Sequence, residues 1–181
     1  MNLNDNKNLV LELSLKSSEI HVFDFDDTIV KTGSMIHVTA ADGEKFSLTP
    51  RQYAMYAPDP GDSFDFSDFE GLIDPRPVNN TLLKLKIAIR DVGIQNVFIL
   101  TARGNPVPVR DFLRDQGVPN IRIFAVGSSN PQAKADVIED EVLSRKIKRV
   151  YFYDDSVKNI MAVRALRQDL PNVEIVAVKV G

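Results

Sequence analysis

Short apolar segments alternate with segments of helical periodicity along most of the chain. Apolar positions three or four residues apart predict a helix from Val78 to Gly93, where the glycine favours the helix end. Alternation of this kind is typical of a parallel β-sheet that is covered by helices on both faces. We therefore expect an α/β domain with five strands and three more helices. The strands are predicted at 20–25, 96–100, 121–126, 150–153 and 173–178, and the helices at 105–117, 130–146 and 156–169.

Residues 31–75 follow another pattern and predict an insertion. Alternating segments at 35–40 and 44–48 flank Asp42-Gly43, a pair typical of tight β-hairpin turns. Thr49-Pro50 is a typical helix start and predicts a short helix through Ala57. An acidic loop that contains several phenylalanines is expected to follow, up to residue 75.

The domain is expected to span residues 19–181, with this insertion inside it. Residues 1–18 are polar and are expected to form a partly disordered N-terminal extension. Within them, residues 10–15 alternate and predict an additional edge strand.

Three carboxylates follow the first predicted strand: Asp24, Asp26 and Asp27. Side chains two residues apart on a strand point to the same face, so we expect Asp24 and Asp26 to face one site and Asp27 to point away. Asp27 is then expected to be a turn or cap residue. Closely spaced carboxylates repel one another, and a hard cation or a shared proton relieves that repulsion.

Polar groups also follow two other strands and open one helix. Thr101 ends the second strand, Asp154 and Asp155 follow the fourth, and Lys134 lies in the first turn of the helix that begins at residue 130. Ligands in such sheets bind beyond the carboxyl ends of the strands, so these groups are expected to meet Asp24 there.

This set of groups suits magnesium and phosphate. Asp24, Asp154 and Asp155 supply the all-oxygen ligands that Mg²⁺ prefers. A zinc site is a poor alternative, because the chain has no cysteine and only two histidines, His21 and His37, for which we expect structural roles.

Phosphoryl oxygens could be held by the Thr101 hydroxyl, the Ala102 N–H and the Lys134 ammonium. Asp24 could then attack phosphorus, and Asp26 could exchange protons with the leaving group and with water.

These motifs resemble those of the haloacid dehalogenase superfamily of phosphohydrolases. Its Asp-x-Asp-x-Thr motif is similar to residues 22–28, its strand that ends in Ser or Thr to 98–101, its helix-opening lysine to Lys134, and its acid pair to 151–155. The resemblance covers about residues 20–178 in the order of the family. It implies a Rossmannoid three-layer fold in which the 31–75 insertion is a small hairpin and helix cap.

The resemblance also implies roles. Asp24 is then the nucleophile that forms an aspartyl-phosphate, Asp26 the general acid and base, and Thr101 and Lys134 the phosphate-holding residues. It places Mg²⁺ on Asp24, on the main-chain carbonyl of Asp26 and on Asp154. Asp155 either binds the ion directly or contacts a residue that binds it. Lys146 and Lys148 are alternative candidates for the phosphate-holding lysine, but they precede the fourth strand and are expected at the opposite edge of the sheet.

Three other features have two interpretations each. Arg103 could contact the substrate or lie on the surface. The basic run 145–149 could bind nucleic acid, but is better explained as cations at a helix carboxyl end. Aromatic residues of the insertion could stack on a base or form a small core of their own: Tyr53, Tyr56, Phe64, Phe66 and Phe69.

The expected activity is that of a Mg²⁺-dependent phosphomonoesterase. The small cap and the seventeen basic against eleven acidic residues of 76–181 favour a phosphorylated polynucleotide end, as in the phosphatase modules of polynucleotide kinase/phosphatase-like repair enzymes, which the chain also resembles. The acidic insertion, with three basic and eight acidic residues, favours a nucleotide or a small phosphorylated metabolite instead.

Two alternatives belong to other classes. One is a receiver-like signalling module and the other a catalytically silent module that binds a phosphorylated ligand. Neither a signal peptide nor a membrane-spanning run is evident, so a cytoplasmic protein with no membrane partner is expected. The oligomeric state stays open.

Overall fold

The computed structural model describes residues 18–53 and 55–181 of the 181-residue chain. The N-terminal extension and the predicted edge strand at 10–15 lie outside the described residues, apart from Ser18. The chain forms two compact units, a larger one that runs up to Val30 and resumes at Pro77–Gly181, and a smaller one, Lys31–Arg76.

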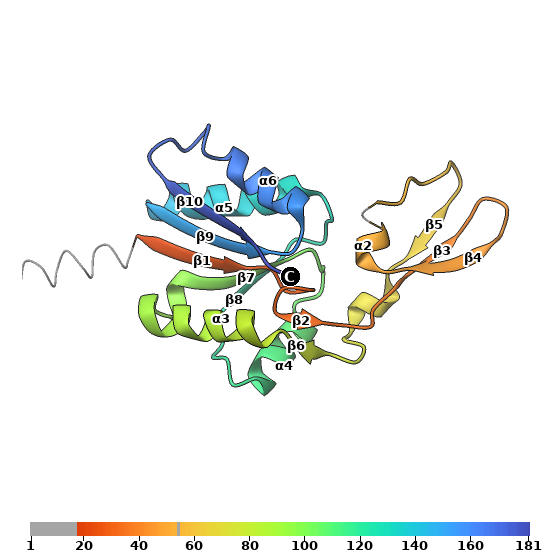
Figure 1. Cartoon of the computed structure of the whole chain (residues 1–181), viewed down its shortest axis with the longest axis horizontal. Coiled ribbons are helices and arrows are strands. Elements are labelled where there is room, and N and C mark those ends of the chain that lie inside the picture. Colours follow the sequence, from red (N-terminus) through yellow and green to blue (C-terminus); the bar gives the residue numbers. More distant parts are fainter. Residues whose placement is uncertain (1–17, 54) are drawn as a thin grey trace, which may run out of the picture. The chain divides into compact units, whose positions relative to one another are not determined.

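The larger unit is built on a five-stranded sheet (Figure 1). All four strand pairs are parallel, and the spatial order is β10-β9-β1-β7-β8. At the centre, Phe23 pairs with Ile99 of β7 on one side and with Tyr153 of β9 on the other. The α/β prediction with a five-stranded parallel sheet is therefore confirmed. The strands are β1 (Glu19–Phe23), β7 (Val97–Thr101), β8 (Arg122–Ala125), β9 (Arg149–Asp154) and β10 (Glu174–Lys179).

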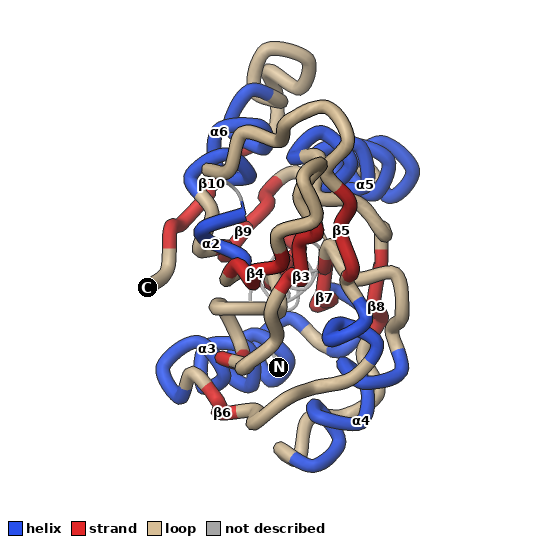
Figure 2. The backbone as a smooth tube through the Cα atoms, turned by 90° about the vertical axis from the view of Figure 1, so that its right-hand side faces the viewer, coloured by secondary structure: helices blue, strands red, loops and turns tan. Residues whose placement is uncertain are grey.

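Helices cover both faces of this sheet. Figures 1 and 2 show α5 and α6 on one face and α3 and α4 on the other. The helices are α3 (Asn79–Val92), α4 (Val107–Asp115), α5 (Pro131–Arg145) and α6 (Val157–Ala165), with a short 3₁₀ turn, η2 (Ile94–Asn96), before β7. The last helix is shorter than predicted, because the chain turns after Ala165 instead of continuing to Asp169.

The start of α5 follows directly from its sequence. The Asn130 side chain accepts a hydrogen bond from the N–H of Gln132 (3.0 Å), and Pro131 occupies the first helical position. Both features are favourable at a helix start, where several N–H groups lack helical partners. They place Lys134 in the first turn, at the edge of the sheet where the strands end.

The smaller unit contains an antiparallel three-stranded sheet in the order β4-β3-β5. Strands β3 (Ile36–Thr39) and β4 (Lys45–Leu48) form the predicted hairpin, and Gly43 in its turn has a φ of 91°, which glycine adopts readily. The predicted irregular loop at 58–75 is wrong in part, because β5 (Ser63–Asp65) pairs with β3 and a 3₁₀ helix, η1 (Ser67–Glu70), follows it.

The short helix of this unit, α2 (Pro50–Tyr53), begins as predicted. Thr49 Oγ1 accepts a hydrogen bond from Gln52 N (3.2 Å), but the helix ends at Tyr53 and not at Ala57. Its Tyr53 ring meets the rings of Phe64 and Phe66 edge-on, with centroids 5.3 and 5.4 Å away. The aromatic rings thus pack on one another, which favours the interpretation as a small core, although Phe66 is 44% exposed.

Two very short strands, β2 (Val30–Lys31) and β6 (Arg76–Pro77), pair where the chain leaves and re-enters the larger unit. Among the described residues, no helix has the combination of length and apolar character that crossing a membrane requires.

Candidate functional site

The candidate site lies where the strand order of the large sheet reverses. From β1 the chain proceeds to β7 and β8 on one side, and then to β9 and β10 on the other. Open α/β sheets bind ligands at the carboxyl ends of the strands at such a point. Asp24 follows β1 there, and its N–H donates to the carbonyl oxygen of Tyr153 (2.9 Å), next to Asp154 at the end of β9.

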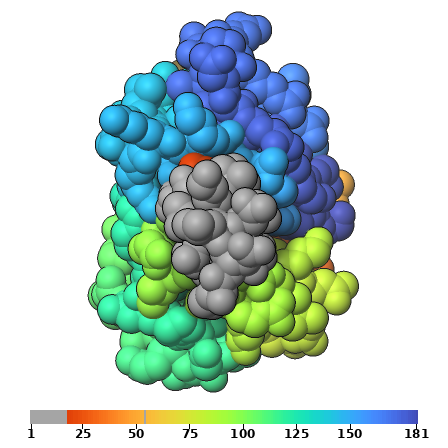
Figure 3. Space-filling model, turned by 90° about the vertical axis from the view of Figure 1, so that its left-hand side faces the viewer, coloured from red at the N-terminus to blue at the C-terminus, as the bar shows by residue number. Residues whose placement is uncertain are grey.

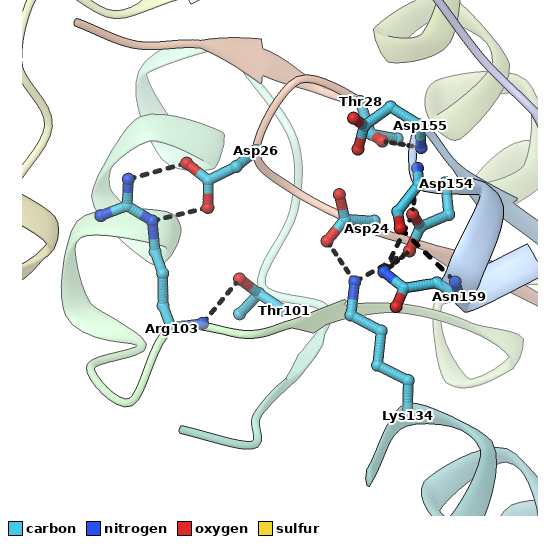
Figure 4. Close-up of polar contacts among 10 residues, drawn as sticks. Asp24, Asp26, Thr28, Thr101, Arg103, Lys134, Asp154, Asp155 and Asn159 are labelled. Atoms are coloured by element: carbon cyan, nitrogen blue, oxygen red, sulfur yellow. Dashed lines mark hydrogen bonds and ion pairs between the residues drawn. The ribbon is translucent and has the colours of Figure 1, made fainter. Parts of the chain in front are cut away.

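Lys134 joins these two carboxylates (Figure 4). Its Nζ donates to Asp24 Oδ1 at 2.6 Å and to Asp154 Oδ2 at 2.8 Å. All three residues are buried, and Asp154 is fully enclosed. A buried charge is tolerated only when it is paired, and here one ammonium faces two carboxyl groups, so the group carries a net negative charge when both are ionised.

Burial and charge act in opposite directions on these groups. Burial raises the pKa of Asp24 well above its usual value, and although the Lys134 ammonium opposes this effect, the neighbouring Asp154 adds to it. Burial by itself lowers the pKa of Lys134, but the carboxylates of Asp24 and Asp154 raise it overall, so this side chain stays protonated. The site therefore favours an additional cation, which would stabilise Asp24 in its ionised form.

Asp154 is held from the first turn of α6. Asn159 Nδ2 donates to both of its carboxylate oxygens, at 3.1 and 3.0 Å, and the N–H of Ser156 donates to Oδ1 at 2.8 Å. Asn159 was not predicted from the sequence. Its position five residues after an acid that ends a strand, on the helix that follows, is the signal that could have indicated it.

Thr28 connects the first loop of the site with the last. Its Oγ1 accepts a hydrogen bond from the N–H of Asp155 (3.1 Å), and the residue is fully buried. The bond fixes the loop after β9 against the turn after β1. This role was not predicted either, because it joins residues that are far apart in the sequence.

Three carboxylates form a group that could hold a metal ion. One oxygen each from Asp24, Asp154 and Asp155 lies within 4.8 Å of the others. Burial raises the pKa of Asp155 to about 6, and the charges of Asp154 and Asp27 contribute. Three carboxylate oxygens with neither nitrogen nor sulfur fit Mg²⁺ by the chemistry of the donors.

Asp26 has a partner of its own, on the other side of the site (Figure 4). Arg103 Nε donates to Asp26 Oδ2 and Arg103 Nη2 to Asp26 Oδ1, both at 2.8 Å. The expectation that Asp24 and Asp26 face one site assumed that both lie on the strand, but β1 ends at Phe23 and both residues lie in the following loop. The charge of Asp26 nevertheless contributes to the raised pKa of Asp24. Arg103, for which substrate contact or the surface was considered, is buried against Asp26.

The phosphate-holding residues predicted at the end of β7 are close to this pair. Thr101 is fully buried, and its Oγ1 accepts a hydrogen bond from the N–H of Arg103 (3.2 Å). A hydroxyl that accepts one hydrogen bond still has its own proton to donate. Ala102, between them, is exposed.

Asp27 lies in the turn after β1, where it has a φ of 56°, and its N–H donates to Val30 O (2.7 Å). Asp and Asn adopt this left-handed conformation more readily than most residues do. Asp27 is thus a turn residue, as expected.

The basic run 145–149 lies at the opposite edge of the sheet. The N–H groups of Lys148 and Arg149 donate to Ser18 O (2.7 and 3.1 Å), so the run is beside the start of β1. Figure 3 views the molecule from the side on which β1 starts. Arg145 pairs with Glu141, and Arg149 pairs with Glu174 and Glu19. These contacts favour the structural interpretation, and they separate Lys146 and Lys148 from the candidate site.

Both histidines have local contacts. His21 bonds to Glu19 and stacks on Tyr151, and His37 bonds to Ser47 and Asp68 inside the smaller unit.

The comparisons with known proteins add no relative. No family model matches the chain, and neither the curated proteins nor the solved structures yield a match.

Proposed function

We propose that this chain is a Mg²⁺-dependent phosphomonoester hydrolase of the haloacid dehalogenase type, which acts through an aspartyl-phosphate on Asp24. The observation that carries the proposal is the Lys134 bridge between Asp24 and Asp154, beside three carboxylate oxygens that lie within 4.8 Å of one another. A buried ammonium and a metal-binding acid group around one carboxylate suit the binding of a phosphate next to a nucleophile.

Each residue then has a defined part in the reaction. Mg²⁺, when bound to Asp24, Asp154 and Asp155, supplies positive charge that offsets the repulsion between these carboxylates and the phosphate. Asp24 attacks phosphorus with one carboxylate oxygen, and the bond from phosphorus to the leaving oxygen breaks. Lys134 holds the phosphoryl oxygens by charge, and Thr101 by its hydroxyl.

Asp26 completes the cycle in this proposal. It gives a proton to the leaving oxygen and later takes one from the water that hydrolyses the aspartyl-phosphate. Its carboxylate is more exposed than that of Asp24, with 23% of the side chain accessible against 7%, so it suits exchange with groups that enter from solvent.

The strand order argues against the receiver-like alternative. Numbered along the chain, the five strands lie in the order 5-4-1-2-3, whereas receivers have the flavodoxin-like order 2-1-3-4-5. The silent-module alternative is weakened by the three carboxylates and the lysine, which all lie at one edge of the sheet.

The test is Mg²⁺-dependent release of phosphate from a 3′-phosphorylated oligonucleotide and from the matching 3′-mononucleotide. Asp24→Asn removes the nucleophile and is expected to lower kcat by about 10⁴-fold or more. Asp169→Asn is the matched control, since it makes the same change at an exposed turn after α6, away from the site.

Faster release from the oligonucleotide would indicate a polynucleotide-end phosphatase, and faster release from the mononucleotide a phosphatase of small metabolites. An Asp24→Asn variant as active as the native protein would contradict the proposed nucleophile.

A further inference from the structure

The guanidinium of Arg103 lies behind the carboxylate of Asp26. The Arg103 side chain is 1% exposed and that of Asp26 is 23% exposed, so solvent reaches the carboxylate but hardly the guanidinium. The two 2.8 Å bonds come from different guanidinium nitrogens and end on different carboxylate oxygens. Such a fork fixes the plane of a carboxylate as well as its position, which a single hydrogen bond does not do.

The surroundings of Arg103 hold it in place. Its N–H donates to Thr101 Oγ1 (3.2 Å), and its carbonyl oxygen accepts from Gly127 N (3.2 Å). Its guanidinium lies over the ring of Phe25, with Cζ 5.8 Å from the centroid. Arg103 is therefore fixed by the ends of β7 and β8 and by the residue next to Asp26.

Asp26 needs this support because the backbone alone does not orient it. The loop after β1 is tight, since Phe25 O accepts hydrogen bonds from the N–H groups of Ile29 (2.8 Å) and Val30 (3.1 Å). These bonds set the path of the main chain, but the side-chain torsions of Asp26 stay undetermined by them. The bidentate contact with Arg103 determines them.

We infer that Arg103 is the positioning residue for Asp26 and acts on the reaction through that carboxylate, and not by binding phosphate. This inference rests on the proposed function, in which Asp26 exchanges protons with the leaving oxygen and with water. Groups that transfer protons must be held within hydrogen-bonding reach of the reacting atom, and misplacement by about 1 Å costs about 10²-fold in rate. Arg103 supplies that placement.

The experiment is a double-mutant cycle in kcat and KM with Arg103→Gln, Asp26→Asn and the double variant. Two substrates are compared: p-nitrophenyl phosphate, whose leaving group needs little protonation, and an alkyl phosphate, whose leaving group needs it strongly. Arg103→Gln is expected to lower kcat for the alkyl phosphate by about 10²-fold, with a smaller loss for the aryl substrate and an almost unchanged KM.

In the Asp26→Asn background, Arg103→Gln should then have little further effect, because the group through which it acts has been changed. Arg103→Lys retains the charge but not the fork, and is expected to lose activity with the same dependence on the leaving group. It also serves as a second variant if Arg103→Gln does not fold, which thermal melting will show.

Four results would overturn the inference. Losses that multiply in the double variant, or a loss confined to KM, would mean that Arg103 binds substrate directly. Equal losses for both substrates would mean that it only supports the fold. A native protein that hydrolyses neither substrate in the presence of Mg²⁺ would remove the proposed function, and the inference with it, so the two failures are distinguishable.

Discussion

Nζ of Lys134 lies 2.6 Å from Oδ1 of Asp24, although 110 residues separate them in the chain. The contact joins the first turn of α5 to the end of the central strand, in a place that solvent hardly reaches. Each partner is buried at a cost that the other offsets, so removal of either is expected to affect both stability and activity.

Lys134→Met is expected to lower the free energy of unfolding by about 3–5 kcal/mol in the presence of a chelator, because the carboxylates of Asp24 and Asp154 lose their buried counter-charge. Urea unfolding measures this change. Addition of Mg²⁺ is expected to recover part of the loss, since the cation replaces some of the missing charge. Lys148→Met, at an exposed lysine, is the control, and equal stability of the two variants would contradict the role given to Lys134.

Asn159→Leu is expected to weaken Mg²⁺ binding by about 10–100-fold, because it removes the amide that orients both oxygens of Asp154. Isothermal titration with Mg²⁺ provides the affinity directly. Asn172→Leu, at an exposed turn after α6, makes the same chemical change away from the site. An Asn159→Leu variant that binds Mg²⁺ as tightly as the native protein would show that Asn159 does not support the metal-binding carboxylates.

The stability of the metal-free protein is expected to fall as pH rises from about 4 to about 7. Burial raises the pKa of Asp155 to about 6, above the 3.8 of a free carboxyl, so in this window the folded state binds more protons than the unfolded state. Asp24 contributes in the same direction. Thermal melting in chelator across this range measures the slope, and Asp155→Asn should flatten it. A slope of opposite sign would show that folding does not raise the pKa of these carboxyl groups.

Tyr56 and Asp62 are joined by a hydrogen bond within the smaller unit. The Tyr56 hydroxyl donates to Asp62 Oδ2 (2.7 Å), and the N–H groups of Asp59 and Ala41 donate to the same carboxylate, at 3.0 and 3.2 Å. These bonds, that of Tyr56 above all, lower the pKa of Asp62. The stabilisation is therefore present above the unfolded pKa of 3.8 and is lost as pH falls through the lower pKa of the folded state.

Asp62→Ala is accordingly expected to speed hydrogen exchange at the amides of Ala41 and Asp59 near neutral pH, and the difference from the native protein should shrink in acid. Asp42→Asn, at the hairpin turn, keeps its acceptor oxygen and is the control. Unchanged exchange at both amides would show that Asp62 does not hold these segments together.

Much of the fold could be predicted because its signals are local. Apolar periodicity and helix caps such as Asn130 depend on residues a few positions apart, so the strands and helices of the larger unit were found within a few residues of their observed ends. The hairpin turn at Asp42-Gly43 has the same origin. Strand β5 was missed because it is three residues long, lies among glycines, prolines and acids, and is stabilised mainly by pairing with β3.

The sequence by itself determined most of the chemical groups that reach the carboxyl edge of the sheet: Asp24, Asp26, Thr101, Lys134, Asp154 and Asp155. Their positions relative to strand ends and helix starts follow from local patterns, and parallel strands bring those ends to one side. Only the tertiary structure decided how the groups pair. These pairings depend on the order of the strands and on the course of the loop after β1: Lys134 with Asp24 and Asp154, Arg103 with Asp26, and Asn159 with Asp154. Local periodicity predicts neither the strand order nor the course of this loop, because both result from packing between segments that are distant in the chain.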